Sequence, residues 1–191
     1  MWQILTITLI SINFVAGHTN CPGFSNYKHD PTLSSHLNGE YLVVYTTSSY
    51  VLDCERISWT VGPGNNRTAY LKDADGCCRR IDNFDSSNPD YIEHDISPLS
   101  TSTCSNLPST ERVSEKLIRS TASGTNLCLF VYICHLSRHG LLVSCREKPE
   151  GLPLLLMIGE IVMELLNLLL PIQVLKTVNH SNCIFTNNCF F

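Results

Sequence analysis

The sequence predicts an all-β domain, either a sandwich or an antiparallel barrel, followed by a single α-helix. Short stretches rich in β-branched and aromatic residues recur from residue 18 to residue 146, and turn residues separate them. The 191 residues include ten cysteines. An even, high count in a short chain is typical of a disulfide framework built in an oxidising compartment. From residue 152 the chain turns aliphatic, which predicts the helix.

Residues 1–17 have the layout of a secretory signal peptide. Residues 1–14 are uncharged and mostly apolar, and Val15 and Gly17 occupy the positions three and one before a cut. Because no lysine or arginine precedes the apolar stretch, a membrane anchor and a buried first strand are the alternatives. All ten cysteines follow Gly17. We therefore expect a secreted, extracellular domain that spans residues 18–191.

Eight segments are expected to form the strands. The clearest is 54–61, where Ile57, Trp59 and Val61 alternate with polar residues, as in a strand with one buried face. Residues 62–66 then form a turn rich in glycine and asparagine. The other predicted strands are 39–47, 68–71, 77–81, 91–96, 113–119, 127–134 and 141–146.

The last two predicted strands indicate a disulfide from their register alone. If residues 135–138 form a hairpin loop, Cys134 lies opposite His139, and the same register places Cys128 opposite Cys145. Directly opposed residues of an antiparallel pair have Cα atoms about 4.5–5.5 Å apart, which is within disulfide reach. We therefore expect a bridge between Cys128 and Cys145.

The aliphatic segment predicts a helix over about residues 152–167. Glu160 and Glu164 lie four positions apart, so they share one helical face and leave the rest apolar. Pro171 stops or kinks the helix. The segment is long enough to span a bilayer, which is the alternative, but carboxylates near its middle are costly in lipid. We expect the helix to dock on a sheet, without stable membrane insertion.

Short motifs follow one another along the chain. They are Cys21-Pro22, Gly39-Glu40-Tyr41, Cys54 ahead of Trp59-Thr60, residues 129–134 (LFVYIC), residues 143–146 (VSCR) and residues 178–183 (VNHSNC). In this order they resemble the lipocalin family, in particular its insect bilin-binding and apolipoprotein D-like branch. The resemblance implies an eight-stranded antiparallel up-and-down β-barrel with a C-terminal α-helix packed on its outside.

The resemblance also implies specific contacts. It implies the disulfides Cys21–Cys134 and Cys54–Cys183, the second of which ties the tail at 171–191 to the barrel, and a barrel floor formed by Gly39, Tyr41 and Arg146. Cys134 and Cys54 then face outward, and side chains alternate along a strand. Phe130 and Tyr132 are therefore expected under the helix, and residues of opposite parity are expected to line a ligand cavity. This cavity set is Tyr41, Val43, Tyr45, Ile57, Trp59, Leu129, Val131 and Leu142.

These features favour a binding protein over an enzyme. The sequence holds no Gly-x-Ser-x-Gly, His-Glu-x-x-His or phosphate-binding glycine loop. A net charge of −4 without a long basic stretch argues against nucleic acid as a partner. We expect sequestration or transport of a small hydrophobic molecule, with no required cofactor and with a bilin, haem, sterol or fatty acid as candidate ligands. The alternative is a filled barrel whose loops bind a protein partner.

The remaining polar signals are weaker. None of the seven histidines has metal-ligand spacing with a cysteine, so we expect no metal site and expect most histidines to be solvated. Asn66 and Asn179 begin Asn-x-Ser/Thr acceptors and are expected to carry N-linked glycans. Four cysteines have no assigned partner, and the sequence leaves their pairing open: Cys77, Cys78, Cys104 and Cys189.

Overall fold

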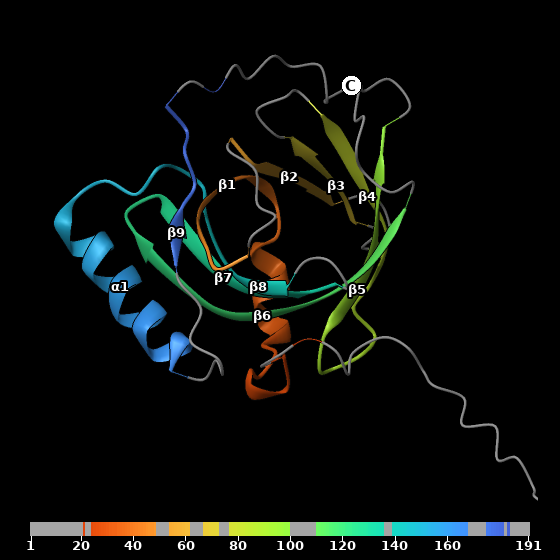
Figure 1. The fold of residues 1–191 in the computed structure, drawn as a ribbon, viewed down its shortest axis with the longest axis horizontal. Helices are drawn as coiled ribbons and strands as arrows, with labels where there is room; N and C mark the ends of the chain where they lie inside the picture. The colour runs from red at the N-terminus through yellow and green to blue at the C-terminus, as the bar shows by residue number, and fades with distance from the viewer. Residues whose placement is uncertain are drawn as a thin grey trace, which may run out of the picture.

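The computed structural model describes residues 21, 24–48, 54–61, 67–72, 77–99, 110–135, 139–167, 175–181 and 183. Within these residues, eight antiparallel strands close into an up-and-down barrel, and a single C-terminal helix packs on its outside (Figure 1). The predicted fold class is thereby confirmed. The predicted signal peptide at 1–17 lies outside the described residues.

The barrel strands follow one another in chain order. They are β1 (Gly39–Thr46), β2 (Arg56–Val61), β3 (Arg67–Lys72), β4 (Cys78–Asp85), β5 (Ile92–Pro98), β6 (Glu111–Ser123), β7 (Asn126–Cys134) and β8 (His139–Cys145). Each strand pairs with the next, and β1 pairs with both β8 and β2. The wall is closed, so the barrel does not present the two unpaired edges of an open sheet.

The C-terminal tail adds a strand that the sequence did not predict. The two-residue strand β9 (Lys176–Thr177) pairs with the end of β1. Beyond it, the Val178 amide donates to the Val44 carbonyl at 3.0 Å, and the Cys54 amide donates to the Asn179 carbonyl at 2.9 Å. The tail therefore lies along the end of β1 and against the residues that precede β2.

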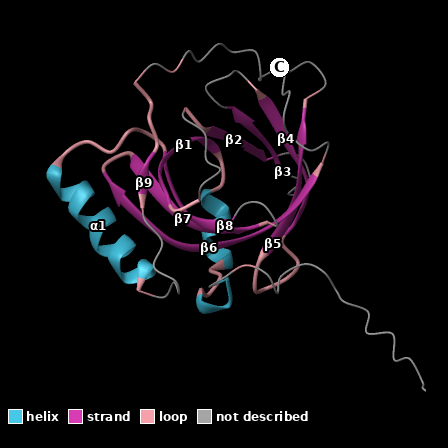
Figure 2. Cartoon of the chain, viewed as in Figure 1, coloured by secondary structure: helices cyan, strands magenta, loops and turns pink. Residues whose placement is uncertain are grey.

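The helix α1 (Leu152–Leu166) covers the outside of the barrel wall, as Figure 2 shows in cyan against the magenta strands. Its buried side chains recur every three or four positions, which is the spacing of one helical face. They are Leu154, Ile158, Val162 and Leu165. These residues pack in one cluster with Phe130 and Tyr132 of β7. The predicted position of the helix over these two side chains is confirmed.

The opposite face of α1 meets solvent. Leu156 and Met163 are exposed there, and the Glu164 carboxylate lies 2.6 Å from the Arg119 guanidinium of β6. In the part of the chain that the structure describes, no helix has both the length and the apolar character needed to cross a membrane.

The three predicted disulfides are present. Cys21–Cys134 attaches the N-terminal segment to β7, and Cys54–Cys183 attaches the tail to the barrel. Cys128 lies opposite Cys145 in the β7–β8 ladder, with Cα atoms 4.0 Å apart, and the two are bonded. The predicted hairpin register is therefore confirmed. Cys77 and Cys78 are also disulfide-bonded.

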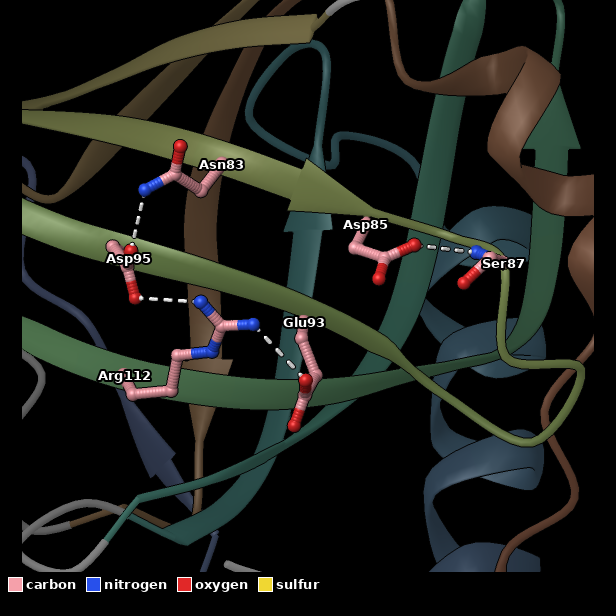
Figure 3. Close-up of polar contacts among 6 residues, drawn as sticks. All are labelled: Asn83, Asp85, Ser87, Glu93, Asp95 and Arg112. Atoms are coloured by element: carbon pink, nitrogen blue, oxygen red, sulfur yellow. Dashed lines mark hydrogen bonds and ion pairs between the residues drawn. The ribbon is translucent and has the colours of Figure 1, made fainter.

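Polar contacts on the outer wall establish which way the side chains of β5 point. Arg112 of β6 reaches Glu93 at 3.1 Å and Asp95 at 3.2 Å, and the Asn83 amide donates to Asp95 at 2.7 Å (Figure 3). Exposed ion pairs of this kind stabilise a fold only slightly. Because successive strand residues point to opposite faces, His94, between Glu93 and Asp95, points into the barrel.

Candidate functional site

The N-terminal segment closes one end of the barrel. It contains the short 3-10 helices η1 (Phe24–Asn26) and η2 (Pro31–His36). The Tyr41 hydroxyl of β1 donates to the His36 carbonyl at 2.5 Å, and Arg146 Nε lies 3.4 Å from the same hydroxyl. Gly39, with φ of 97°, begins β1 next to this contact. The residues expected at the floor therefore lie at this end, and Tyr41 and Arg146 contact each other.

Removing the Tyr41 hydroxyl should destabilise this closed end. The variant Tyr41→Phe removes one of the two donors to the His36 carbonyl and the hydroxyl oxygen that Arg146 Nε approaches, so we expect a loss of about 1 kcal/mol in the free energy of unfolding, measured by urea denaturation. Tyr45→Phe is the matched control, with an expected change within about 0.5 kcal/mol. Equal losses in the two variants would contradict this role for Tyr41.

Inside the barrel, two small cavities lie above the floor, with volumes of about 50 and 30 Å³. Ile57, Trp59, Leu142 and Glu115 line both of them. Tyr41, Leu129 and Val131 line the smaller cavity. Val43 packs beside this region, in contact with Leu142 and with Val178 of the tail. The predicted cavity set thus lies mostly on the inner wall.

Tyr45 is the exception, and its predicted inward position is wrong. In the β1–β8 ladder Val43 faces Ser144 and Tyr45 faces Val143, so Val44 is the extra residue of a β-bulge. The extra residue reverses the parity of the strand beyond it. Tyr45 consequently packs with the cluster between the barrel wall and α1, and not in the lumen.

Ionisable side chains also face the larger cavity, although no sequence motif indicated them. They are Glu55, His94, Glu115 and His135. Arg79 of β4 lies 3.7 Å from Glu55, and both side chains are almost fully buried. Glu111 of β6 lies 3.8 Å from Nδ1 of His135. The lumen thus combines an apolar wall with carboxyl and imidazole groups.

Glu115 and His94 are the most deeply buried of these groups. Burial raises the pKa of the Glu115 carboxyl to about 7. Burial lowers the pKa of the His94 imidazole to about 4, and the nearby Asp95 carboxylate offsets this only in part. Nδ1 of His94 has no hydrogen-bond partner among the described residues. At neutral pH His94 is therefore an uncharged imidazole with one nitrogen available to a ligand.

His94 and His29 are exceptions to the expectation that most histidines are solvated, since they are only 2% and 5% exposed. The parity of β5 could have revealed His94, because Ile92 and Ile96 share its face. The parity of β6 could likewise have revealed Glu115, which shares its face with Val113 and Leu117. The sequence signal for both His94 and Glu115 is an ionisable residue on the apolar face of a predicted strand.

A larger depression, of about 770 Å³, lies outside the barrel beside the N-terminal segment. Its two buried basic side chains have partners: Lys116 donates to the Tyr27 carbonyl at 2.8 Å, and the Leu117 amide donates to Nδ1 of His29 at 3.1 Å. The Lys116 ammonium also lies over the Phe24 ring. We place the candidate site in the lumen, where Nδ1 of the buried His94 has no hydrogen-bond partner among the described residues.

The comparison with known proteins gives one result: no family model and no curated protein matches this sequence. The closed barrel with one outer helix is compatible with a lipocalin-like fold. Membership of the lipocalin family stays a prediction.

The predicted glycosylation sites have different positions. Asn66 lies outside the described residues, whereas Asn179 is exposed. The Asn179 side-chain oxygen accepts a hydrogen bond from the Ser181 amide at 3.0 Å, within its own Asn-x-Ser motif. Glycosylation at either position stays a prediction.

Proposed function

We propose that this protein is an extracellular, lipocalin-like binding protein that takes up a small, mainly apolar molecule in its barrel lumen. The observation that carries the proposal is the pair of buried ionisable groups, Glu115 and His94, at an apolar internal cavity. An unpartnered buried polar group costs about 1–3 kcal/mol. A barrel filled for structural reasons alone would favour apolar side chains at both positions.

The disulfides support the extracellular part of the proposal. Disulfides persist in secreted proteins and are rare where thiols are kept reduced. Three bridges tie the N-terminal segment, the last hairpin and the tail to the barrel wall. The signal-peptide pattern of residues 1–17 points to the same compartment.

The cavity volumes indicate the size of the ligand. A water-sized group needs about 10–15 Å³, so the two cavities accommodate a molecule of a few non-hydrogen atoms or one end of a larger one. A bilin, haem or sterol would need space beyond these two cavities. Affinity would come from burying apolar ligand surface, at about 25 cal/mol per Å².

Trp59 provides a direct test, because it lines both cavities and the only other tryptophan is Trp2. We expect saturable changes in Trp59 fluorescence when the purified protein is titrated with isoamyl compounds, which have an apolar body of about five carbons. Leu142→Phe fills the shared wall and should abolish the signal. Leu156→Phe, on the exposed face of α1, is the matched control and should retain it.

A second candidate function is a protein-interaction role with a filled barrel. The observation that favours it is the small size of the cavities, since ligand pockets usually measure about 300–1,000 Å³. In that case no isoamyl compound would change the Trp59 signal, and Leu142→Phe would behave as the wild type does.

A further inference from the structure

We propose that the lumen selects a small organic cation, an alkylammonium whose charged nitrogen lies between Glu115 of β6 and His94 of β5. The inference rests on the proposed function, because it names the chemical class of molecule that the lumen takes up. The ligand would therefore carry a positive charge at one end of an apolar body.

Of the three carboxyl groups at or beside the larger cavity, Glu115 is the one with no basic side chain close to it among the described residues. Arg79 lies 3.7 Å from Glu55, and Glu111 lies 3.8 Å from His135. The Glu115 carboxyl has no such neighbour among the described residues, and desolvation alone accounts for its shifted pKa. An isolated carboxylate is unfavourable in a buried site unless a cation neutralises it. A cationic ligand would supply the missing charge.

His94 is a second and independent observation at the same site. Its side chain is 2% exposed, lines the larger cavity, and has an Nδ1 atom without a hydrogen-bond partner in the described residues. A neutral imidazole has one nitrogen that accepts a hydrogen bond. Glu93 and Asp95, its neighbours along β5, point outward to Arg112, so they do not compete for this nitrogen.

The ladder geometry allows one ligand nitrogen to reach both groups. His94 pairs with Val113 in the β5–β6 ladder, and Glu115 lies two positions further along β6 on the same face. Such diagonal neighbours have Cα atoms about 7–8 Å apart, within reach of long side chains. An ammonium carries three N–H donors, so it can donate to both groups at once. The apolar body would then lie against Trp59 and Leu142.

The other ligand charges fit less well. An anion would meet the carboxyl groups of Glu55 and Glu115 on the cavity wall. The guanidinium of Arg79 lies behind that wall, 3.7 Å from Glu55, so its positive charge is already paired. A neutral alcohol would bind best while Glu115 is protonated and able to donate. A cation needs the ionised carboxylate, so the two ligand classes have opposite pH dependences.

The direction of the pH dependence follows from the groups that face the ligand nitrogen. Burial raises the pKa of Glu115 to about 7, and His94, with a pKa of about 4, stays neutral above about pH 6. Glu55, Arg79, Glu111 and His135 are the other charged or titratable groups around the larger cavity. An alkylammonium stays protonated throughout the range from about pH 6 to about pH 8, because its pKa is about 10. Its affinity should therefore rise as the pH increases through 7.

The experiment compares three probes of one shape, isoamylamine, isoamyl alcohol and isovalerate, by Trp59 fluorescence and by calorimetry on the full-length secreted protein. At about pH 8 we expect isoamylamine to bind about tenfold more tightly than the alcohol, with isovalerate the weakest. Between about pH 8 and about pH 6 the amine preference should fall about tenfold. The wild-type pH series needs no substitution, so it tests the proposal even if a variant fails to fold.

Glu115→Gln should lower the affinity for isoamylamine about tenfold at about pH 8. Glu160→Gln, at an exposed position of α1, is the matched control and should bind the amine as the wild type does. Equal or tighter binding of the alcohol or of isovalerate at about pH 8 would overturn the charge inference and leave the proposed function intact. Absence of binding by all three probes would overturn both.

Discussion

Replacing both cysteines of the Cys21–Cys134 bridge with alanine will lower the free energy of unfolding by about 4–5 kcal/mol. The two residues are 113 positions apart, so the bridge removes much conformational freedom from the unfolded chain. In the folded protein it holds Phe24 and Tyr27 against Tyr132 of β7. Chemical denaturation of the double variant under non-reducing conditions measures the effect.

The Cys128–Cys145 bridge is the matched comparison. Its cysteines are only 17 positions apart and already lie opposite each other in a continuous ladder. The same chain-entropy argument predicts a loss of about 3 kcal/mol for its double alanine variant. A loss as large as that from the Cys21–Cys134 variant would show that strand packing, and not loop length, determines the stabilisation.

The second large effect is a pair of opposite pH dependences of stability. Burial raises the pKa of Glu115 from 4.5 to about 7, so the folded protein retains a proton that the unfolded chain has released. Stability from this group is therefore lost as the pH rises from about 4.5 to about 7. Burial lowers the pKa of His94 from 6.5 to about 4, so stability is lost as the pH falls through that window. Between about pH 4.5 and 6.5, the loss of stability from Glu115 with rising pH and the gain from His94 oppose each other.

Single substitutions should separate the contributions of Glu115 and His94 to the pH dependence of stability. The stability of Glu115→Gln relative to the wild type should rise by about 3 kcal/mol between about pH 4.5 and 7. The stability of His94→Phe relative to the wild type should rise by a similar amount as the pH falls from about 6.5 to 4. Urea denaturation across this pH range measures both differences. Curves that run parallel to the wild type, as expected for Glu160→Gln, would contradict the burial of these two groups.

Local sequence patterns predicted much of this molecule for identifiable reasons. Alternation in residues 54–61 predicted β2, because a half-buried strand needs one apolar face. The apolar spacing after residue 152 predicted α1, whereas its docking on Phe130 and Tyr132 was implied by the lipocalin resemblance together with strand parity. The separation of Cys128 and Cys145 predicted their bridge, since a short hairpin determines the register of its two strands.

The sequence by itself therefore determined the strands, the outer helix and the hairpin disulfide, because each follows from neighbours along the chain. The tertiary structure decided the rest. The bulge that turns Tyr45 outward depends on how β1 pairs with β8, and the added strand β9 depends on the tail reaching β1. Glu115 and His94 become buried because the closed wall surrounds them with apolar side chains from other strands. Strand parity can place both side chains on the apolar face of a strand, but how deeply they are buried depends on what lies across the barrel.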